Sequence, residues 1–177
     1  SEHLHDGTTV GALAVCNAFG DVYDPQGNIL AGVRNVEQGG GFLNTLHLLR
    51  DERIHRAFAI RQRHNAYQSA PVEEHQTPDD ADAPLTQNTT LAVIATDAHL
   101  TKAAATKLAQ MAQDGLPRAI RPVHTSFDGD MVFALATGQR PAPHLTILGS
   151  VAADVLEIAI RRAVTEAVSL GGIPAVG

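Results

Sequence analysis

The sequence predicts a mixed α/β (α+β) domain, in which helices pack against a sheet around one core. Its 177 residues, 44% of them hydrophobic, can enclose a sizeable core, so the length requires no second domain. Two β-rich apolar runs, Thr8 to Asn17 and a second that begins at Thr89, indicate strands covered on both faces. The run from Ser150 to Val168 has a wide apolar helical face that is expected to pack on that sheet.

The region after the first strand changes character twice. Turn residues from Asp24 to Asn28 precede a return strand from Ile29 to Val33, and the first strand and this one are predicted to form a hairpin. Beyond them only a short helix is expected, around Thr45 to Ile60. Residues 68–87 are rich in Pro, Asp and Glu, and bury too little apolar surface to offset the entropy of ordering. They are predicted to form a mobile linker.

Regular structure is predicted to return abruptly at Thr89. The next element is an Ala-rich helix from Lys102 to Asp114, for which Thr101 is a suitable N-cap. Gly115 is expected near the end of this helix, and Pro117 is expected to bend or stop it.

The last two elements complete the predicted order, strand, strand, linker, strand, helix, strand, helix. Met131 to Thr137 is a third apolar strand. The final helix is expected to be capped by Ser150 and closed by the glycines at 171 and 172.

Composition excludes several classes of partner. A formal charge of −6 and 4% aromatic residues leave no basic surface for phosphates and few rings for base stacking, so no nucleic acid is expected. No apolar run is long enough to cross a bilayer, and the first residues do not resemble a signal sequence, so no membrane partner is expected. The single cysteine, Cys16, agrees with a reducing compartment, and the cytoplasm is the expected location.

Metal and cofactor chemistry have little support in the sequence. Nine histidines are present, but none has the spacing of a His-Glu-x-x-His or Cys/His metal site, so no metal and no cofactor is predicted. Cys16 lies in an apolar run without an electropositive neighbour, which favours a small buried side chain over a nucleophile.

The junction between Asn88 and Thr89 has three interpretations. Asn88, Thr89 and Thr90 match a glycosylation acceptor, which matters only in a secreted protein. Composition alone favours an ordinary strand start at Thr89. A threonine that opens a strand after a dispensable linker is also where cutting the chain would create an N-terminal nucleophile.

Asp128, Gly129 and Asp130 form the second candidate feature. Taken alone, this triplet is typical of a tight turn. If it belongs to a strand, alternation places both carboxylates on one face, while Gly129 permits a close backbone approach. Asn17 ends the first strand and could donate its amide to an oxyanion, although an uncommitted strand-end Asn is the commoner case.

Five stretches of the sequence share a resemblance. They are VGALAVCNAFGDV (Val10 to Val22), NTTLAVIATD (Asn88 to Asp97), AQMAQDG (Ala109 to Gly115), RAIRPVHT (Arg118 to Thr125) and FDGDMVFALATG (Phe127 to Gly138). Together they closely resemble the L-aminopeptidase/D-esterase family, which includes the β-aminopeptidases and the nylon-oligomer hydrolase. Many members carry serine at the position of Thr89, and threonine is the variant of the nylon-oligomer hydrolase branch.

The resemblance implies an αββα sandwich made by cleavage of one precursor. Residues 1–177 would form part of this single domain, covering the C-terminal part of the precursor. Residues 1–88 would end the N-terminal subunit, and residues 89–177 would form the C-terminal subunit that carries the nucleophile. The expected partners are therefore the N-terminal subunit of the same precursor, further copies in a homo-oligomer, and a small peptide or amide substrate.

The resemblance also assigns the site. Cleavage after Asn88 would free Thr89, which serves as the nucleophile of both the processing and the hydrolytic reaction, with its own α-amine as the base. Asn17 falls on the active-site asparagine, and Asp128 with Asp130 falls on the pair that contacts the nucleophile. The alternatives are an acyltransferase of the ornithine acetyltransferase type and a noncatalytic binding module with the same fold.

A geometric prediction follows for the two strands. Pairing the strand that opens with Thr89 beside the strand that follows the triplet would bring their ends to one rim. Asp128 and Asp130 would then both be directed at Thr89, and Gly129 would point away and leave room for substrate.

Overall fold

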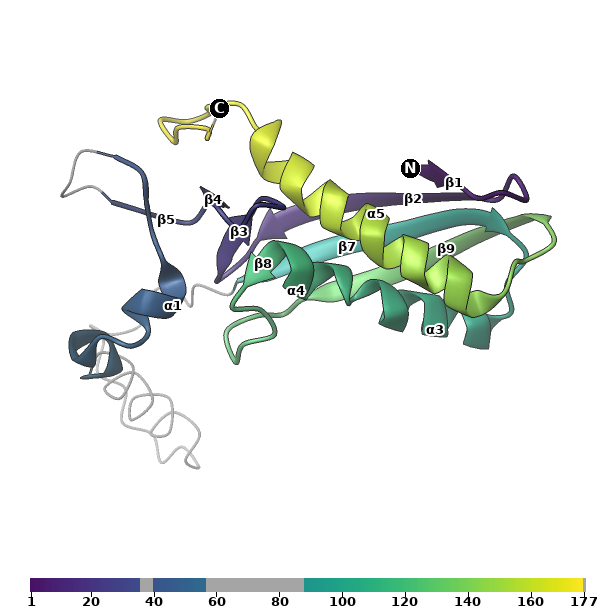
Figure 1. Ribbon diagram of the computed structural model, residues 1–177, viewed down its shortest axis with the longest axis horizontal. Coiled ribbons are helices and arrows are strands. Elements are labelled where there is room, and N and C mark those ends of the chain that lie inside the picture. Colours follow the sequence, from purple (N-terminus) through teal and green to yellow (C-terminus); the bar gives the residue numbers. More distant parts are fainter. Residues whose placement is uncertain (36–39, 57–87, 177) are drawn as a thin grey trace, which may run out of the picture.

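The computed structural model describes residues 1–35, 40–56 and 88–176. Within this part of the chain the main sheet has the order β1 (Glu2–His3), β2 (Thr9–Asn17), β7 (Thr89–Ala98) and β9 (Met131–Arg140) (Figure 1). The three apolar strands predicted from the sequence are thus confirmed. The predicted linker at 68–87 lies outside the described residues.

The register of the sheet is set by two long pairings. β2 runs antiparallel to β7, with Val10 opposite Thr96 and Asn17 opposite Thr89. β7 runs parallel to β9, with Leu91 beside Met131. A parallel pair needs a crossover connection, which here contains α3 (Lys102–Ala112), α4 (Gly115–Ala119) and β8 (Ile120–Arg121).

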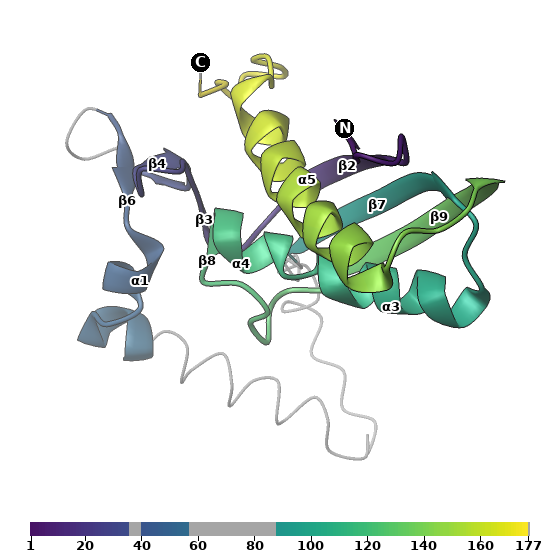
Figure 2. The ribbon, with the colours of Figure 1, turned by 45° about the vertical axis from the view of Figure 1, so that its right-hand side comes forward.

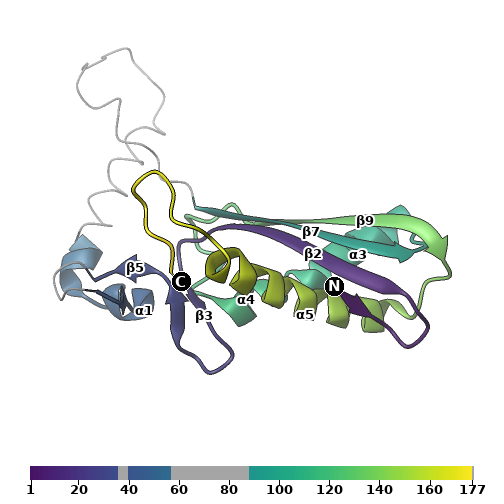
Figure 3. The same cartoon turned by 90° about the horizontal axis from the view of Figure 1, so that it is seen from above.

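One face of the main sheet is covered by helices α3, α4 and α5 (Leu145–Thr165) (Figures 1 and 3). The cap of α3 is confirmed, because the Thr101 side chain accepts a hydrogen bond from the backbone N–H of Ala104 at 3.2 Å. α3 ends at Ala112 with Gln113 as its C-cap, so Gly115 lies near the end of this helix as predicted. It begins α4, whose first turn tolerates Pro117 because the N–H groups there have no helical partner.

Helix α5 starts earlier and ends earlier than the sequence predicts. His144 is its N-cap, and its ring accepts from the N–H of Thr146 at 3.3 Å. Ser150 lies inside the helix, where its hydroxyl donates to the carbonyl of Thr146 at 2.8 Å. Leu148 is fully buried, so the apolar face extends upstream of Ser150, the predicted cap.

The predicted hairpin exists with a different first strand. β3 (Asp21–Tyr23) pairs with β4 (Ile29–Ala31) and with β8, while β2 is engaged by β7. The remaining described elements are β5 (Val33–Arg34), β6 (Phe42–Leu43) and α1 (Thr45–Leu48), which lie with β3 and β4 beyond one end of the main sheet (Figure 2). α1 and residues 52–56 are the described part of the helical region predicted around Thr45 to Ile60.

Elements β3 to β6 and α1 form what we call the smaller region, and Asp21 links β3 to α1 within it. Its side chain is fully buried and accepts from the backbone N–H of Thr45 at 2.7 Å and from the Thr45 hydroxyl at 2.6 Å. A buried carboxylate is costly unless it is hydrogen-bonded, and these two donors offset that cost while fixing the start of α1 against β3.

The core lies between the helices and the sheet. The largest fully buried apolar side chains come from two strands, β7 and β8, and three helices: Ile94, Leu108, Leu116, Ile120, Leu148, Leu156 and Ile160. α4 packs closely on α5 at Gly115, where a side-chain Cβ would come within 2.5 Å of the Ala153 carbonyl oxygen.

The opposite face of the sheet is apolar and exposed, although the sequence predicted strands covered on both faces. Two registered rows of side chains, one of Val15, Leu91 and Met131 and the other of Leu13, Val93 and Phe133, cross β2, β7 and β9. Together with Leu135 they are between 37% and 70% exposed. We call these seven residues the open apolar face. In the part of the chain that the structure describes, no helix is long and apolar enough to cross a membrane.

The contact at Gly115 predicts a specific loss of stability. Gly115→Ala would force the backbones of α4 and α5 apart, so we expect the free energy of unfolding to fall by about 1–3 kcal/mol. Gly11→Ala is the matched control, since a Cβ there would meet only the Ser1 side chain at an ordinary 3.6 Å. Urea unfolding of both variants measures the difference, and equal stabilities would contradict the proposed close packing.

Candidate active site

Thr89 is the first residue of β7, at the end of the main sheet that faces the smaller region (Figure 1). It is paired with Asn17, the last residue of β2. Directly opposite residues of an antiparallel pair project from the same face, so Thr89 and Asn17 form the row that follows Val15 and Leu91 on the sheet. Both candidate residues therefore lie at the rim of the open apolar face.

The Asp-Gly-Asp triplet lies directly beside the Asn88–Thr89 junction. Asn88 forms a parallel bridge with Asp128, and the same register continues to Leu91 and Met131 in the sheet. Residues far apart in the sequence thus meet at one rim, which confirms the predicted pairing of the two strands.

Gly129 faces the Thr89 side chain, which corrects the prediction that this glycine points away. A Cβ built on Gly129 would lie 3.0 Å from Thr89 Oγ1. Registered neighbours on adjacent strands share a face, so the residue beside Thr89 projects where Thr89 projects. The missing side chain provides the space that the threonine hydroxyl occupies.

The carbonyl group of Asn88 is the focus of the hydrogen bonds at this junction. Its oxygen accepts from Thr89 Oγ1 at 2.7 Å and from the backbone N–H of Gly129 at 2.9 Å. The N–H of Asn88 donates to the carbonyl oxygen of Phe127 at 3.2 Å. The residue before the threonine is therefore held at both of its backbone polar groups by the chain around the triplet.

Asp128 fixes the loop rather than the hydroxyl of Thr89. One carboxylate oxygen accepts from the backbone N–H of Phe19 at 3.2 Å. The other accepts from the backbone N–H of Thr125 at 3.0 Å and from its hydroxyl at 2.7 Å. The carboxylate connects the chain that follows β2 to the loop that precedes β9.

Asp130 is buried on the helix-covered side of the sheet, with a side chain only 3% exposed. Its Oδ1 accepts from the backbone N–H of Thr90 at 2.7 Å. Its Oδ2 is buried without a hydrogen-bond partner, and the nearest described basic group is the ring of His124, whose Nδ1 lies 3.8 Å away. Burial raises the pKa of Asp130 above that of an ordinary aspartate, although the hydrogen bond from Thr90 opposes the shift.

The two carboxylates share a face, as alternation requires, but it is the face of Thr90 and not that of the Thr89 hydroxyl. In the described part of the chain, Asp130 reaches the backbone of Thr90 and Asp128 reaches Phe19 and Thr125. Among the hydrogen bonds of the described residues, the Thr89 hydroxyl donates to the carbonyl of Asn88 and to neither carboxylate, so the predicted approach of both aspartates to this hydroxyl stays a prediction.

Sequence reasoning missed the backbone groups of Phe127 and Gly129, because main-chain donors and acceptors leave no signal in residue identity. It also gave no role to Thr125, although a hydroxyl three residues before an aspartate can form a local side-chain bond. His124 has a φ of 56°, an uncommon conformation for a residue other than glycine, and nothing in the sequence indicated it.

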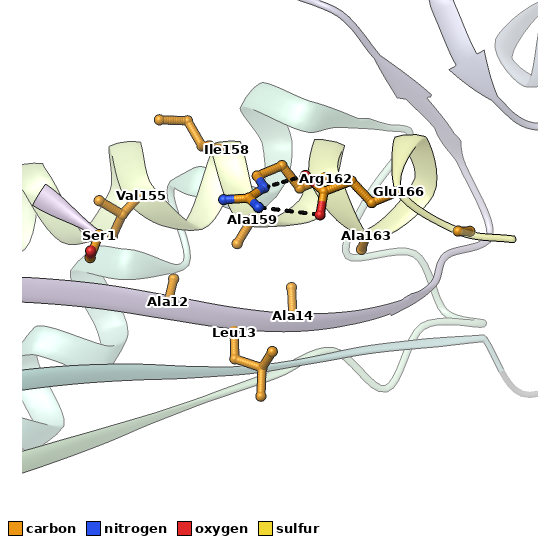
Figure 4. A pocket seen from close by; sticks show the side chains of 11 residues that line it. Ser1, Ala12, Leu13, Ala14, Val155, Ile158, Ala159, Arg162, Ala163 and Glu166 are labelled. Carbon is orange, nitrogen blue, oxygen red and sulfur yellow. Dashed lines mark hydrogen bonds and ion pairs between the residues drawn. The ribbon is translucent and has the colours of Figure 1, made fainter. Parts of the chain in front are cut away.

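A groove of about 410 Å³ lies elsewhere, between β2 and α5 (Figure 4). Ala12, Ala14 and Ala159 line it, and the ion pair of Arg162 and Glu166 lies along its wall. None of the candidate site residues lines this groove. Among the residues that the structure describes, no three His, Cys, Asp or Glu side chains are grouped so that they could hold a metal ion.

The site is thus a threonine hydroxyl at a strand start beside a carbonyl oxygen that also accepts from a glycine N–H, in a mixed α/β domain. The chain belongs to peptidase family S58, whose model matches residues 1–175. This family corresponds to the L-aminopeptidase/D-esterase and nylon hydrolase group that the sequence motifs resemble.

Similar proteins carry the names of hydrolytic enzymes. An uncharacterized aminopeptidase of Mycobacterium tuberculosis (strain ATCC 25618 / H37Rv) is 38% identical over 188 residues, which cover 98% of this chain and 48% of the relative. An uncharacterized aminopeptidase of Mycobacterium leprae (strain TN) is 38% identical over 185 residues, covering 97% and 44%. A 6-aminohexanoate-oligomer endohydrolase of Kocuria sp. (strain KY2) is 28% identical over 166 residues, covering 86% and 39%. The chain spans less than half the length of these relatives.

The raised pKa of Asp130 predicts a pH-dependent stability. The Asp130 carboxyl binds its proton more tightly in the native state than in the unfolded chain. The contribution of this carboxyl to the free energy of unfolding therefore falls as the pH rises from about 3.8 through the native pKa. Asp130→Asn keeps an oxygen acceptor for the N–H of Thr90 and does not titrate. We therefore expect the variant to gain stability relative to the wild type as the pH rises from about 4 to about 7. Urea unfolding of both proteins across this pH range tests the prediction. A difference in the free energy of unfolding that does not change with pH would contradict it.

Proposed function

We propose that the protein is a self-processing amidohydrolase in which Thr89 is the nucleophile and the bond after Asn88 is the first one cut. The observation that carries this proposal is the contact between Thr89 Oγ1 and the carbonyl group of Asn88, at 2.7 Å between the oxygens. The hydroxyl and the bond it would attack are already adjacent, and Gly129 donates to the same carbonyl oxygen. Membership of peptidase family S58 supports hydrolysis as the type of reaction.

The processing reaction is an acyl shift followed by hydrolysis. Thr89 Oγ1 bonds to the carbonyl carbon of Asn88, the peptide C–N bond breaks, and the hydroxyl proton ends on the departing nitrogen of Thr89. This leaves an ester between Asn88 and the Thr89 side chain. Water then adds its hydroxyl to the carbonyl carbon and returns a proton to Oγ1, which yields the Asn88 carboxylate and Thr89 with a free α-amine.

That free amine supplies the base that a threonine hydroxyl otherwise lacks. An α-amine has a reference pKa of about 7.7–8.0, so a substantial fraction is uncharged near neutral pH. The amine takes the proton from Oγ1 as the hydroxyl attacks a substrate amide, and an acyl ester forms that water hydrolyses. The names of the relatives favour small peptides or amides as substrates.

The neighbouring polar residues act on the position of these groups. Asp130 holds the N–H of Thr90 and thereby fixes the residue that follows the nucleophile. Asp128 fixes the loop that supplies Gly129. Asn17 is registered opposite Thr89, and in this proposal its amide donates to the carbonyl of a bound substrate.

The open apolar face supports an αββα sandwich for the whole protein. Seven large apolar side chains on one face form a patch of the kind that a folded protein covers. The matched relatives are about twice as long as this chain, so their remaining length is sufficient for a second layered sheet. We propose that such a sheet, from the N-terminal subunit of the same precursor, packs on this face, and that residues 1–88 and 89–177 stay associated after cleavage.

Cleavage at Thr89 predicts a new N-terminus. N-terminal sequencing of the protein produced from its complete gene should yield a fragment that begins with Thr89. Thr89→Val keeps the shape of the side chain, removes the hydroxyl, and should abolish both this fragment and amide hydrolysis while leaving the far-ultraviolet circular dichroism unchanged. A cut chain or normal turnover in that variant would eliminate Thr89 as the nucleophile.

The sandwich predicts that a charge on the open apolar face is destabilising. In the protein from the complete gene, Phe133→Asp would bury an unpaired carboxylate, and we expect a loss of about 2–4 kcal/mol in the free energy of unfolding. Gln139→Asp, at an exposed position in the same strand, is the control and should stay within about 0.5 kcal/mol of the wild type. If the two variants are equally stable, the face is not covered.

A further inference from the structure

We propose that His124 is a positioning residue of the candidate active site, whose ring holds the buried carboxylate of Asp130 and thereby the backbone next to Thr89. His124 lies in the loop between β8 and β9, outside the Asp-Gly-Asp triplet, and no step of the proposed reaction uses it. The inference rests on the proposed function, and it adds to that function a side chain that acts on the nucleophile through Asp130.

The first observation is an unpartnered oxygen on a buried carboxylate. The side chain of Asp130 is 3% exposed, and its Oδ1 accepts from the N–H of Thr90 at 2.7 Å. Its Oδ2 is buried and has no hydrogen-bond partner among the described residues. A buried polar oxygen without a partner costs free energy, so a donor that reaches Oδ2 stabilises the ionised carboxylate. The ionised form is also the stronger acceptor for the N–H of Thr90.

The second observation is the donor that lies beside this oxygen. Nδ1 of His124 is 3.8 Å from Oδ2 of Asp130, which is within the range of an ion pair and longer than the about 3.2 Å of a hydrogen bond. The side chain of His124 is 48% exposed, so packing leaves the ring room to close this gap. An imidazole carries an N–H at Nδ1 in its charged form and in one neutral tautomer, so it can donate to Oδ2 in either charge state.

The third observation is the backbone conformation of His124. Its φ of 56° lies in the left-handed region, which is uncommon for a residue with a side chain. The loop is fixed on both sides of it, because a Cβ on Gly20 would collide with the carbonyl oxygen of Pro122, and Thr125 donates twice to Asp128. An uncommon conformation that neighbouring contacts maintain marks a side chain that is needed in one direction.

The fourth observation is the charge of the groups around Asp130. Within the described residues, the titratable side chains that act on it are Asp128, Cys16 and His124. Burial raises the pKa of Asp130 and Asp128 adds to this effect, whereas the N–H of Thr90 and the ring and N–H of His124 lower it. Burial also raises the pKa of the Cys16 thiol, which therefore supplies no charge near neutral pH. Of these three side chains, only His124 can carry the positive charge that keeps Asp130 ionised.

Cleavage makes the contact between His124 and Asp130 more important. In the uncut chain Thr89 is also held through the backbone of Asn88, which is bonded to the loop of the triplet. Once the bond after Asn88 is cut, those bonds no longer reach Thr89, and its backbone keeps the pairing with β2 and the neighbouring bond from Thr90 to Asp130. A looser Asp130 would displace the hydroxyl from a substrate, and a displacement of about 1 Å is enough to slow catalysis.

The first test measures whether His124 acts on the charge of Asp130. In the uncut Thr89→Val protein from the complete gene, the amide proton resonance of Thr90 reports the ionisation of the carboxylate to which it donates. His124→Gly removes the ring and should raise the pKa of Asp130, read as the midpoint of this titration, by about one pH unit. His99→Gly is the control, because it removes an exposed imidazole at the other end of β7, and it should leave the midpoint unchanged.

Two outcomes of this titration overturn the proposal. An unchanged midpoint in His124→Gly would show that the ring does not act on Asp130. An equal rise in His99→Gly would show that the ring makes no specific contact. The measurement does not require the chain to cut itself, so it decides the role of His124 even if the proposed function fails.

The second test is kinetic and separates the donor from the backbone conformation. Gly and Asn both adopt the left-handed conformation, but only Asn has a side-chain N–H that can replace Nδ1. In the protein from the complete gene, His124→Gly should slow cleavage after Asn88 by about tenfold, and His124→Asn should cut at least about threefold faster than His124→Gly. The rate is measured from the fragment that begins with Thr89.

Equal cleavage rates in His124→Gly and His124→Asn overturn the proposal, because the donor then makes no difference. A wild-type rate in His124→Gly overturns it as well and leaves Thr89 as the proposed nucleophile. A wild-type chain that stays uncut contradicts the proposed function instead, and the titration of Asp130 then decides the role of His124.

Discussion

The parallel pairing of β7 with β9, carried one step beyond the sheet to Asn88 and Asp128, is the constraint on which the candidate site depends. This pairing places the Asp-Gly-Asp triplet beside the junction between Asn88 and Thr89. The triplet lies 40 residues further along the chain, as the separation of Thr90 and Asp130 shows. A parallel pair requires a crossover, and the crossover through α3, α4 and β8 also builds the core beneath the sheet. Packing of these helices on α5 therefore holds the register that brings Gly129 to Thr89.

Strand alternation then divides the polar groups of the site between two faces. Thr89, Gly129 and Asn17 lie on the open face, whereas Asp130 is buried with Thr90 on the helix-covered face. A buried carboxylate with one unpartnered oxygen is unfavourable, and the helix-covered core has to tolerate it. The other oxygen of Asp130 accepts from the N–H of Thr90, and this bond fixes the backbone immediately after Thr89.

The sequence was sufficient for the long strands and for the pairing of β7 with β9, and insufficient for the partner of β4 and for the face on which Gly129 lies. Hydrophobic runs predicted β2, β7 and β9, and the predicted N-cap at Thr101 was confirmed. Both kinds of feature depend on residues that are close together in the sequence. The predicted partner of β4 was wrong, because β4 pairs with β3 and not with β2. The residue pattern of β2 does not show that its edge pairs with β7, whose Thr89 lies opposite Asn17 although it is 72 residues further along the chain. The face of Gly129 was wrong for the same reason, since a parallel register, and not the triplet itself, decides which residue lies beside Thr89.

The position of Thr89 at the rim of the open apolar face links folding to chemistry in the proposed enzyme. A second sheet over Val15, Leu91 and Met131 would remove water from the row next to Thr89, and a drier site strengthens the attraction between the Gly129 N–H and a developing oxyanion. The backbone donor needs no reorganisation for this, because the loop around Asp128 is already fixed by Phe19 and Thr125. Assembly of the sandwich would then activate a junction whose hydrogen bonds are formed in the uncut chain.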